Sequence, residues 1–255
     1  MLKIGPYIFV LVLVTATGLI GSPARAEEDP PDPLAASRRA IERGDALLKL
    51  GRVVPACLQF EVALGIAPQW WYAAFRYALC RAQSGDAKDT LYLLHSASGS
   101  GRQLYVVHLA LARWYAENTR PEDSIGEFEK AIALTKGAIE PMVELADLLV
   151  SLERQDEAER VLKKAQYFSP TNLAVRARLA RVAEQLGHLW VAEEEYRFLA
   201  MRGANRRRNL ALLARFYSAQ GKRKASAGVL GILETGPDSP GASLPAPIFK
   251  PLGTQ

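Results

Sequence analysis

The sequence predicts an all-α protein, a solenoid of about six helix-turn-helix units that stack along the chain. Three observations predict this fold. One residue pattern recurs every 34 positions, each copy spaces its apolar residues as a helix does, and glycines fall between its two halves. A single helix pair cannot bury its apolar face, so the core has to form by stacking neighbouring pairs.

Composition and charge are those of a globular protein. Of the 255 residues, 49% are hydrophobic and 23% are charged. This balance excludes an intrinsically disordered chain and a multispanning membrane protein. The formal net charge is +5, and removal of an N-terminal segment containing Lys3 and Arg25 leaves +3.

The first 26 residues have the layout of a secretory signal peptide. Lys3 gives a positive start, residues 7–20 are mostly apolar, and Ala24-Arg25-Ala26 is a small-x-small triplet. We expect cleavage after Ala26 and export to a bacterial periplasm. The alternative is an uncleaved segment that anchors the chain in the inner membrane, facing the periplasm. The apolar stretch is short for a membrane span, which needs ~20 residues.

A proline-rich linker, residues 27–36, precedes the solenoid, which we expect over residues 37–234. In the first half of each unit, a small residue follows a larger one at 34-residue intervals: Arg43-Gly44, Tyr77-Ala78, Leu111-Ala112, Leu145-Ala146, Leu179-Ala180 and Leu213-Ala214. The six units are 37–70, 71–104, 105–138, 139–172, 173–206 and 207–240.

The second half of each unit repeats as well. Its small column is Ala56, Thr90, Ser124, Ala158, Ala192 and Ser226, followed four residues later by Phe60, Leu94, Phe128, Leu162, Tyr196 and Leu230. Spacings of three and four place such residues on one helical face. Between the halves, a left-handed residue is expected to end the first helix at Gly51, Gly85, Gly187 and Gly221.

These columns resemble the tetratricopeptide repeat (TPR) family, whose 34-residue units carry small residues where two helices cross. The resemblance covers residues 37–238 and implies a right-handed solenoid that binds a protein or peptide in a concave groove. The first helix of each unit lines that groove in the family. Carried over to this chain, the groove residues are Tyr72, Phe75, Leu79, Gln83, Arg113, Glu117, Asp147, Arg181, Arg208 and Arg215. An alternative for Tyr72 and Phe75 is packing under the N-terminal linker.

Charge is uneven along the chain. Residues 200–255 carry nine basic and two acidic side chains, a net charge of +7. We expect either a solvated face or contact with an anionic surface through Arg206, Arg207, Arg208, Lys222, Arg223 and Lys224. The export signal disfavours nucleic acid as a partner.

The two cysteines, Cys57 and Cys80, lie at one level of neighbouring antiparallel helices. In an exported protein they form either a disulfide or two buried free thiols. The three histidines have no metal-ligand spacing, and no nucleophile, phosphate-loop or dinucleotide motif appears, so we expect no metal, no cofactor and no enzyme. We expect Glu193-Glu194-Glu195 to be a run of charged residues on a solvent-exposed helix face.

Residues 235–255 are rich in proline and glycine and predict a disordered tail, with a short partner-binding segment at 248–250 as the alternative. Export and repeats together predict a non-catalytic scaffold that supports assembly of a cell-envelope complex. The alternatives are a periplasmic chaperone or sensor that captures extended peptides, and an adaptor anchored in the inner membrane.

Overall fold

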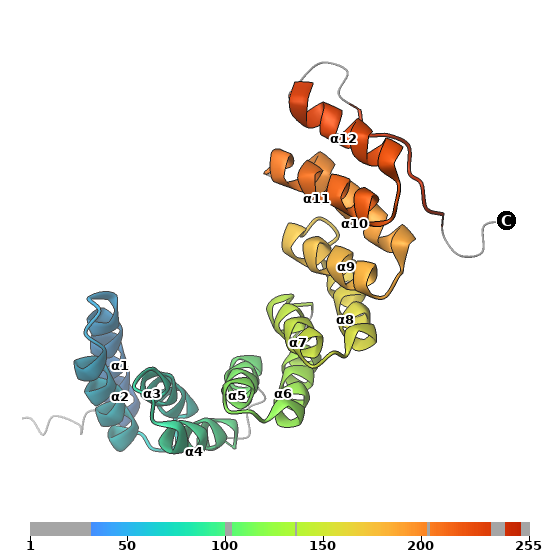
Figure 1. Cartoon of the computed structure of the whole chain (residues 1–255). Helices are drawn as coiled ribbons and strands as arrows, with labels where there is room; N and C mark the ends of the chain where they lie inside the picture. Colours follow the sequence, from blue (N-terminus) through green and yellow to red (C-terminus); the bar gives the residue numbers. More distant parts are fainter. Residues whose placement is uncertain (1–31, 100–103, 136, 203–204, 236–242, 251–255) are drawn as a thin grey trace, which may run out of the picture.

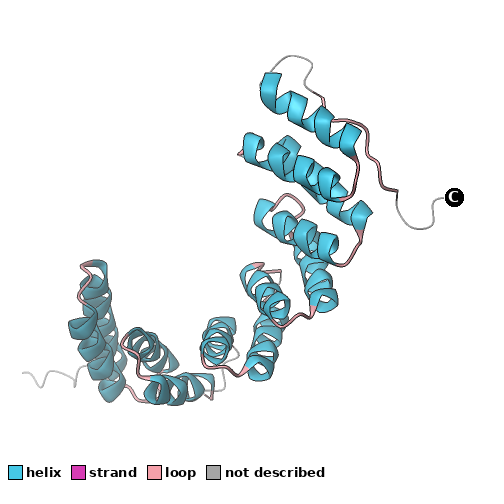
Figure 2. Ribbon diagram, in the orientation of Figure 1, coloured by secondary structure: helices cyan, strands magenta, loops and turns pink. Residues whose placement is uncertain are grey.

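The computed structural model describes residues 32–99, 104–135, 137–202, 205–235 and 243–250. Over these ranges the chain forms twelve helices and no strand (Figure 2). They are α1 (Pro33–Lys49), α2 (Val53–Ile66), α3 (Trp71–Gln83), α4 (Ala87–Ser98), α5 (Tyr105–Glu117), α6 (Pro121–Leu134), α7 (Glu140–Ser151), α8 (Gln155–Phe168), α9 (Leu173–Gln185), α10 (Leu189–Arg202), α11 (Arg206–Ala219) and α12 (Arg223–Thr235). The segment expected to be a signal peptide lies outside the described residues.

The helices follow one another along an open arc (Figure 1). Each helix packs against the next one in the chain. From α3 to α11 the odd-numbered helices lie along the inner side of the arc and the even-numbered helices along its outer side (Figure 1). The expected all-α solenoid is therefore confirmed.

The small residues of each unit are buried where its two helices cross. Ala78, Ala112 and Ala180 are fully buried, and Ser124 donates its hydroxyl hydrogen to the carbonyl oxygen of Ala112 at 2.7 Å. The first unit has glycine at this position because a Cβ on Gly44 would lie 2.5 Å from the Phe60 ring. Close helix approach therefore explains the small columns.

The turn inside each unit contains a residue with positive φ. Gly51, Gly85, Gly187 and Gly221 have φ between 70° and 80°, as the sequence predicted. Thr119 and Glu153 occupy the same place in units three and four, with φ of 56° and 59°. No glycine marks these two turns, so the sequence pattern did not reveal them.

One helix boundary and one core position differ from the prediction. Helix α1 begins at Pro33, within the expected linker, because Asp32 caps the helix and accepts a hydrogen bond from the Leu34 amide at 3.0 Å. In α12 the expected core residue Leu230 is 44% exposed, and its neighbour Val229 is buried instead.

The predicted disorder of the tail is wrong for residues 243–250. Leu244, Ile248 and Phe249 pack against the core cluster formed by α9 to α12. Residues 236–242 and 251–255 lie outside the described residues. The apolar side chains between the prolines give this segment the buried surface that a disordered tail lacks.

Candidate protein-binding surface

Three hollows follow one another between neighbouring inner helices. The first, about 250 Å³, lies between the end of α3 and the end of α5. The second, about 270 Å³, lies between α5 and α7, and the third, about 160 Å³, between α7 and α9. Glu117 lines the first two hollows, and Asp147 lines the second and the third. Because adjoining hollows share residues, they form one path along the inner side of the arc.

Four of the ten predicted groove residues line this path. Arg113, Glu117 and Asp147 line the second hollow. Asp147 and Arg181 line the third. The structure thus brings together, from three different helices, residues that the repeat alignment selected one by one.

Ion pairs connect neighbouring inner helices across the same surface. Arg113 of α5 binds Glu144 of α7, with its Nε 2.8 Å from Glu144 Oε2, and its Nη2 lies 2.7 Å from Glu140 Oε1. These carboxylates raise the pKa of Arg113. One step along the arc, Arg178 of α9 binds both carboxylate oxygens of Asp147, each at 2.8 Å.

The same kind of contact occurs just beyond each end of the path. Asp45 of α1 pairs with Arg76 of α3, and Arg215 of α11 lies 3.6 Å from Glu184 of α9. Exposed pairs contribute only ~0–1 kcal/mol each. Their main consequence is to fix the positions of side chains and leave fewer charges for a partner.

Of the six charged residues in the predicted groove, three therefore have ion-pair partners within the chain and three do not. Arg113, Asp147 and Arg215 are paired as described above. Within the described part of the chain, no ion pair or hydrogen bond engages the side chain of Glu117, Arg181 or Arg208, and all three residues are exposed. These are the charged side chains of the predicted groove that remain available to a bound partner.

The ion pairs between inner helices recur at equivalent positions of the repeat. In the N-terminal half this series is interrupted once. Asp45, Leu79, Arg113 and Asp147 are equivalent, 34 residues apart, and three of them bind the next inner helix through Arg76, Glu144 and Arg178 respectively. The fourth is Leu79, whose counterpart on α5 is Ala110. Leu79 is 38% exposed, so the inner surface between α3 and α5 is apolar at this position, and we call it the apolar step.

An aromatic cluster lies on α3 beside this apolar step. The Tyr72 ring centroid is 5.3 Å from Trp71 and 6.5 Å from Phe75. Tyr72 also accepts a hydrogen bond from Arg76 at 3.3 Å. Tyr72 and Phe75 are half-buried, while Gln83 at the end of α3 is exposed. Sequence reasoning did not select Trp71, because it used only fixed unit positions.

Four glutamates on the outer helices are buried: Glu127, Glu159, Glu193 and Glu195. Glu193 and Glu195 belong to the run expected to be solvated, so that expectation is wrong for both. Burial acts to raise the pKa of Glu127, but hydrogen bonds from His108 and Lys130 outweigh it and lower that pKa. Glu195 shows the opposite balance, and burial raises its pKa despite hydrogen bonds from Gln166 and Arg176.

The expected basic surface is divided in two. Arg206, Arg207 and Arg208 begin α11, whereas Lys222, Arg223 and Lys224 lie at the start of α12, beyond the other end of α11. The fourteen residues of α11 separate the two groups by about 21 Å. A single compact anionic ligand would therefore meet one group or the other.

The structure joins Cys57 of α2 to Cys80 of α3 in a disulfide, with Cα atoms 5.4 Å apart. No group of three or more metal-ligating side chains gathers in the part of the chain that is described. None of the described helices is both long and apolar enough to cross a membrane.

Comparison with proteins of known structure identifies the fold. No protein-family model and no curated protein sequence matches the chain. The structure of PilF from Pseudomonas aeruginosa is similar, with a TM-score of 0.62, 18% identity, and coverage of 81% of this chain and 95% of that one.

Two further solved structures resemble the chain. PilW, described as a widely conserved type IV pilus biogenesis factor, has a TM-score of 0.60 and 17% identity, covering 80% of this chain and 94% of its own. YrrB, described as a TPR protein with an unusual peptide-binding site, has a TM-score of 0.57 and 15% identity, covering 70% and 93%. The fold of this chain is therefore that of the tetratricopeptide repeat proteins.

Proposed function

We propose that the chain is a non-catalytic protein-interaction scaffold of the bacterial cell envelope, which holds an extended segment of a partner along its inner side. The observation that carries the proposal is the path of adjoining hollows between α3 and α9. Its charged lining divides into side chains fixed by ion pairs and the unpaired Glu117 and Arg181. Fixed charges form a surface that needs no reordering on binding, which reduces the entropic cost of association.

The lining indicates what kind of segment fits. The apolar step at Leu79 and the aromatic cluster of α3 suit an apolar side chain of the partner. Farther along, Glu117 offers a carboxylate and Arg181 a guanidinium. A segment with an apolar anchor followed by charges of both signs is complementary to this order.

The envelope assignment has two supports. The first 26 residues resemble an export signal, and a solved structure of similar fold belongs to a pilus biogenesis factor. The alternative function is a chaperone that captures apolar peptides transiently, favoured by the aromatic cluster beside the exposed Leu79. A stable partner of fixed stoichiometry distinguishes the scaffold from the chaperone.

Charge reversal tests the proposal. Glu117→Lys and Arg181→Glu change the inner side, while Glu129→Lys and Lys164→Glu make the same changes at exposed positions of α6 and α8. Proximity labelling in the native envelope should recover one partner set with the wild type and both outer variants, and lose it with the inner variants. Equal recovery from all four variants, at unchanged helicity and melting temperature, would refute binding on the inner side.

A further inference from the structure

The C-terminal segment, residues 243–250, is bound to the solenoid as a peptide ligand would be. The two carboxylate oxygens of Glu193 accept hydrogen bonds from the Ile248 amide at 2.8 Å and the Phe249 amide at 2.7 Å. The hydroxyl of Tyr217 donates to the same carboxylate at 2.6 Å. Glu193 is only 1% exposed, so a charged group is buried against main-chain donors of the segment.

Side chains complete the contact. The Phe249 ring lies 5.8 Å from that of Phe216, edge to face, and Lys222 Nζ lies 5.7 Å from the Phe249 ring centroid. Arg197 donates a hydrogen bond to the carbonyl oxygen of Pro245. The site therefore holds a backbone that presents two consecutive amides, a carbonyl oxygen three residues before the first of them, and an aromatic side chain.

The preceding unit shows what this site looks like without a peptide. Glu159 is equivalent to Glu193, and its carboxylate is bound by His188 and Lys163, each at 3.0 Å. The equivalents of these two side chains, 34 residues later, are Lys222 and Arg197.

Around Glu193, Lys222 and Arg197 are both directed to the segment instead. Lys222 faces Phe249, and Arg197 binds Pro245 and the hydroxyl of Tyr217, at 3.3 Å from the latter. If the segment leaves, Lys222 and Arg197 can return to Glu193 in the arrangement seen around Glu159. Release would then leave no unpaired buried charge, a state that would otherwise be costly.

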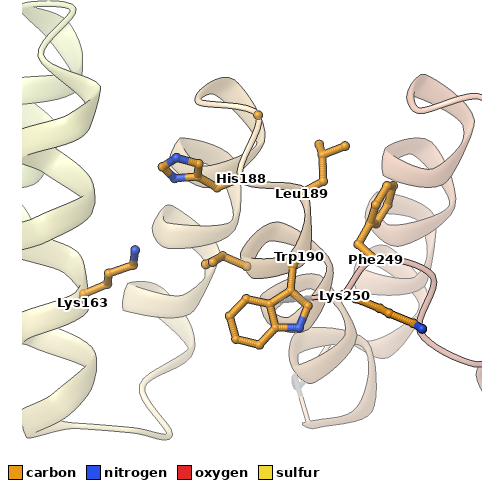
Figure 3. A pocket seen from close by; sticks show the side chains of 8 residues that line it. Lys163, His188, Leu189, Trp190, Phe249 and Lys250 are labelled. Carbon is orange, nitrogen blue, oxygen red and sulfur yellow. The ribbon is translucent and has the colours of Figure 1, made fainter. Parts of the chain in front are cut away.

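The segment also leaves space beside it. Phe249 and Lys250 form one wall of a cavity of about 500 Å³, whose other walls include Trp190, Leu189 and Lys163 (Figure 3).

We infer that the surface of α10, α11 and α12 beneath residues 243–250 is a second peptide-binding site, separate from the inner side of the arc. Its ligands are partner segments of the same class as the chain's own Pro247-Ile248-Phe249, in which a proline is followed by an apolar and an aromatic residue. The chain's own segment occupies the site until such a partner displaces it.

The test uses the full chain and a labelled peptide with the sequence of residues 243–250. Phe249→Ala weakens the chain's own segment and leaves the site intact. Fluorescence anisotropy should show saturable binding of the peptide to this variant. Binding to the wild type should be at least about tenfold weaker, because a tethered segment competes at an effective concentration in the millimolar range.

Two controls test the role of Glu193. N-methylation of the two peptide amides that correspond to Ile248 and Phe249 removes only the hydrogen-bond donors and should abolish binding. Adding Glu193→Gln to the Phe249→Ala chain should weaken binding, whereas adding Glu159→Gln should not.

Three outcomes would overturn the inference. If the folded Phe249→Ala chain does not bind the peptide, the segment is a permanent cap. If the N-methylated peptide binds as well as the unmodified one, Glu193 does not recognise the backbone. If the wild type forms dimers in sedimentation that Phe249→Ala does not form, the occupant is the segment of a second copy.

Discussion

The two ends of the solenoid are closed in different ways. At the N-terminal end a disulfide joins α2 to α3, yet Val54, Leu58, Val62 and Ile66 remain exposed along one face of α2. At the C-terminal end the chain folds back, and residues 243–250 cover α10 to α12. Terminal repeats lack a neighbour on one side and need some form of cap. One end is stabilised by a covalent constraint and the other by added buried surface.

Removing the disulfide should have the largest effect. The bridge spans 23 residues, and a loop of that length stabilises the fold by about 3 kcal/mol through the unfolded state. The double variant Cys57→Ser, Cys80→Ser should have a lower melting temperature. In hydrogen exchange, the backbone amides of α1 to α3 should be the first to lose protection. Reductant should destabilise the wild type and leave the double variant unchanged. If the variant melts like the oxidised wild type, the disulfide does not stabilise this end.

Gly44→Ala tests close packing at the same end. The added Cβ would meet the Phe60 ring at 2.5 Å, so we expect a cost of about 1–3 kcal/mol in the free energy of unfolding. Gly65→Ala, on the same helix pair, meets nothing within 4 Å and should stabilise by ~0.5–1 kcal/mol. Chemical denaturation measures both. Opposite signs support the packing at the crossing, and equal signs contradict it.

Phe249→Ala tests the closure of the C-terminal end. The ring is only half-buried, so we expect a loss of about 1–2 kcal/mol, less than the 3–5 kcal/mol of a fully buried phenylalanine. Amides of α11 and α12 should exchange faster, while those of α1 to α3 should not change. Uniform acceleration along the chain would show that the segment is no local cap.

Glu153→Gly compares the middle of the solenoid with its ends. Both ends have glycine at the left-handed turn position, whereas Glu153 has φ of 59°. Relieving that conformation should stabilise the chain by up to ~1 kcal/mol. Glu157→Gly, inside α8, should destabilise it by a similar amount. Thermal melting checks both signs, and a destabilised Glu153→Gly would contradict the account of this turn.

The smallest effect concerns acid stability in the middle units. The folded-state pKa of Glu127 lies below its ordinary value of 4.5, so its ionised form stabilises the fold above that pH. The contribution is lost as the pH falls from 4.5 through the folded-state pKa. Glu127→Gln should therefore cost stability at pH 7 and less at lower pH. A cost that stays the same from pH 7 to pH 3 would contradict the role of the carboxylate.

The features that follow from the 34-residue period, such as the helix crossings, could be predicted from the sequence. Ala112 and Ser124 could be placed at a helix crossing because spacing alone puts them there. Thr119 and Glu153 could not be recognised as left-handed residues, since neither residue type signals that conformation. The pairing of Asp147 with Arg178 depends on which face of α9 meets α7, and equivalent positions elsewhere hold Leu79 and Ala110.

The packing of the C-terminal segment on the chain's own solenoid was not predicted, for a different reason. Its proline and glycine content is typical of disorder, and its partner Glu193 belongs to a run that resembles a solvated face. Only the fold brings Phe249 to Glu193. A local pattern cannot report a contact between residues so far apart in the chain.

Site-specific photo-crosslinking in living cells tests the central claim, that a partner binds on the inner side of the arc. A photoreactive amino acid would replace Gln185, which is exposed in the hollow between α7 and α9, or Tyr167, which is exposed on α8. The account predicts one crosslinked partner from position 185 and none from position 167. The same partner crosslinked from position 167 alone, or equally from both positions, would contradict it.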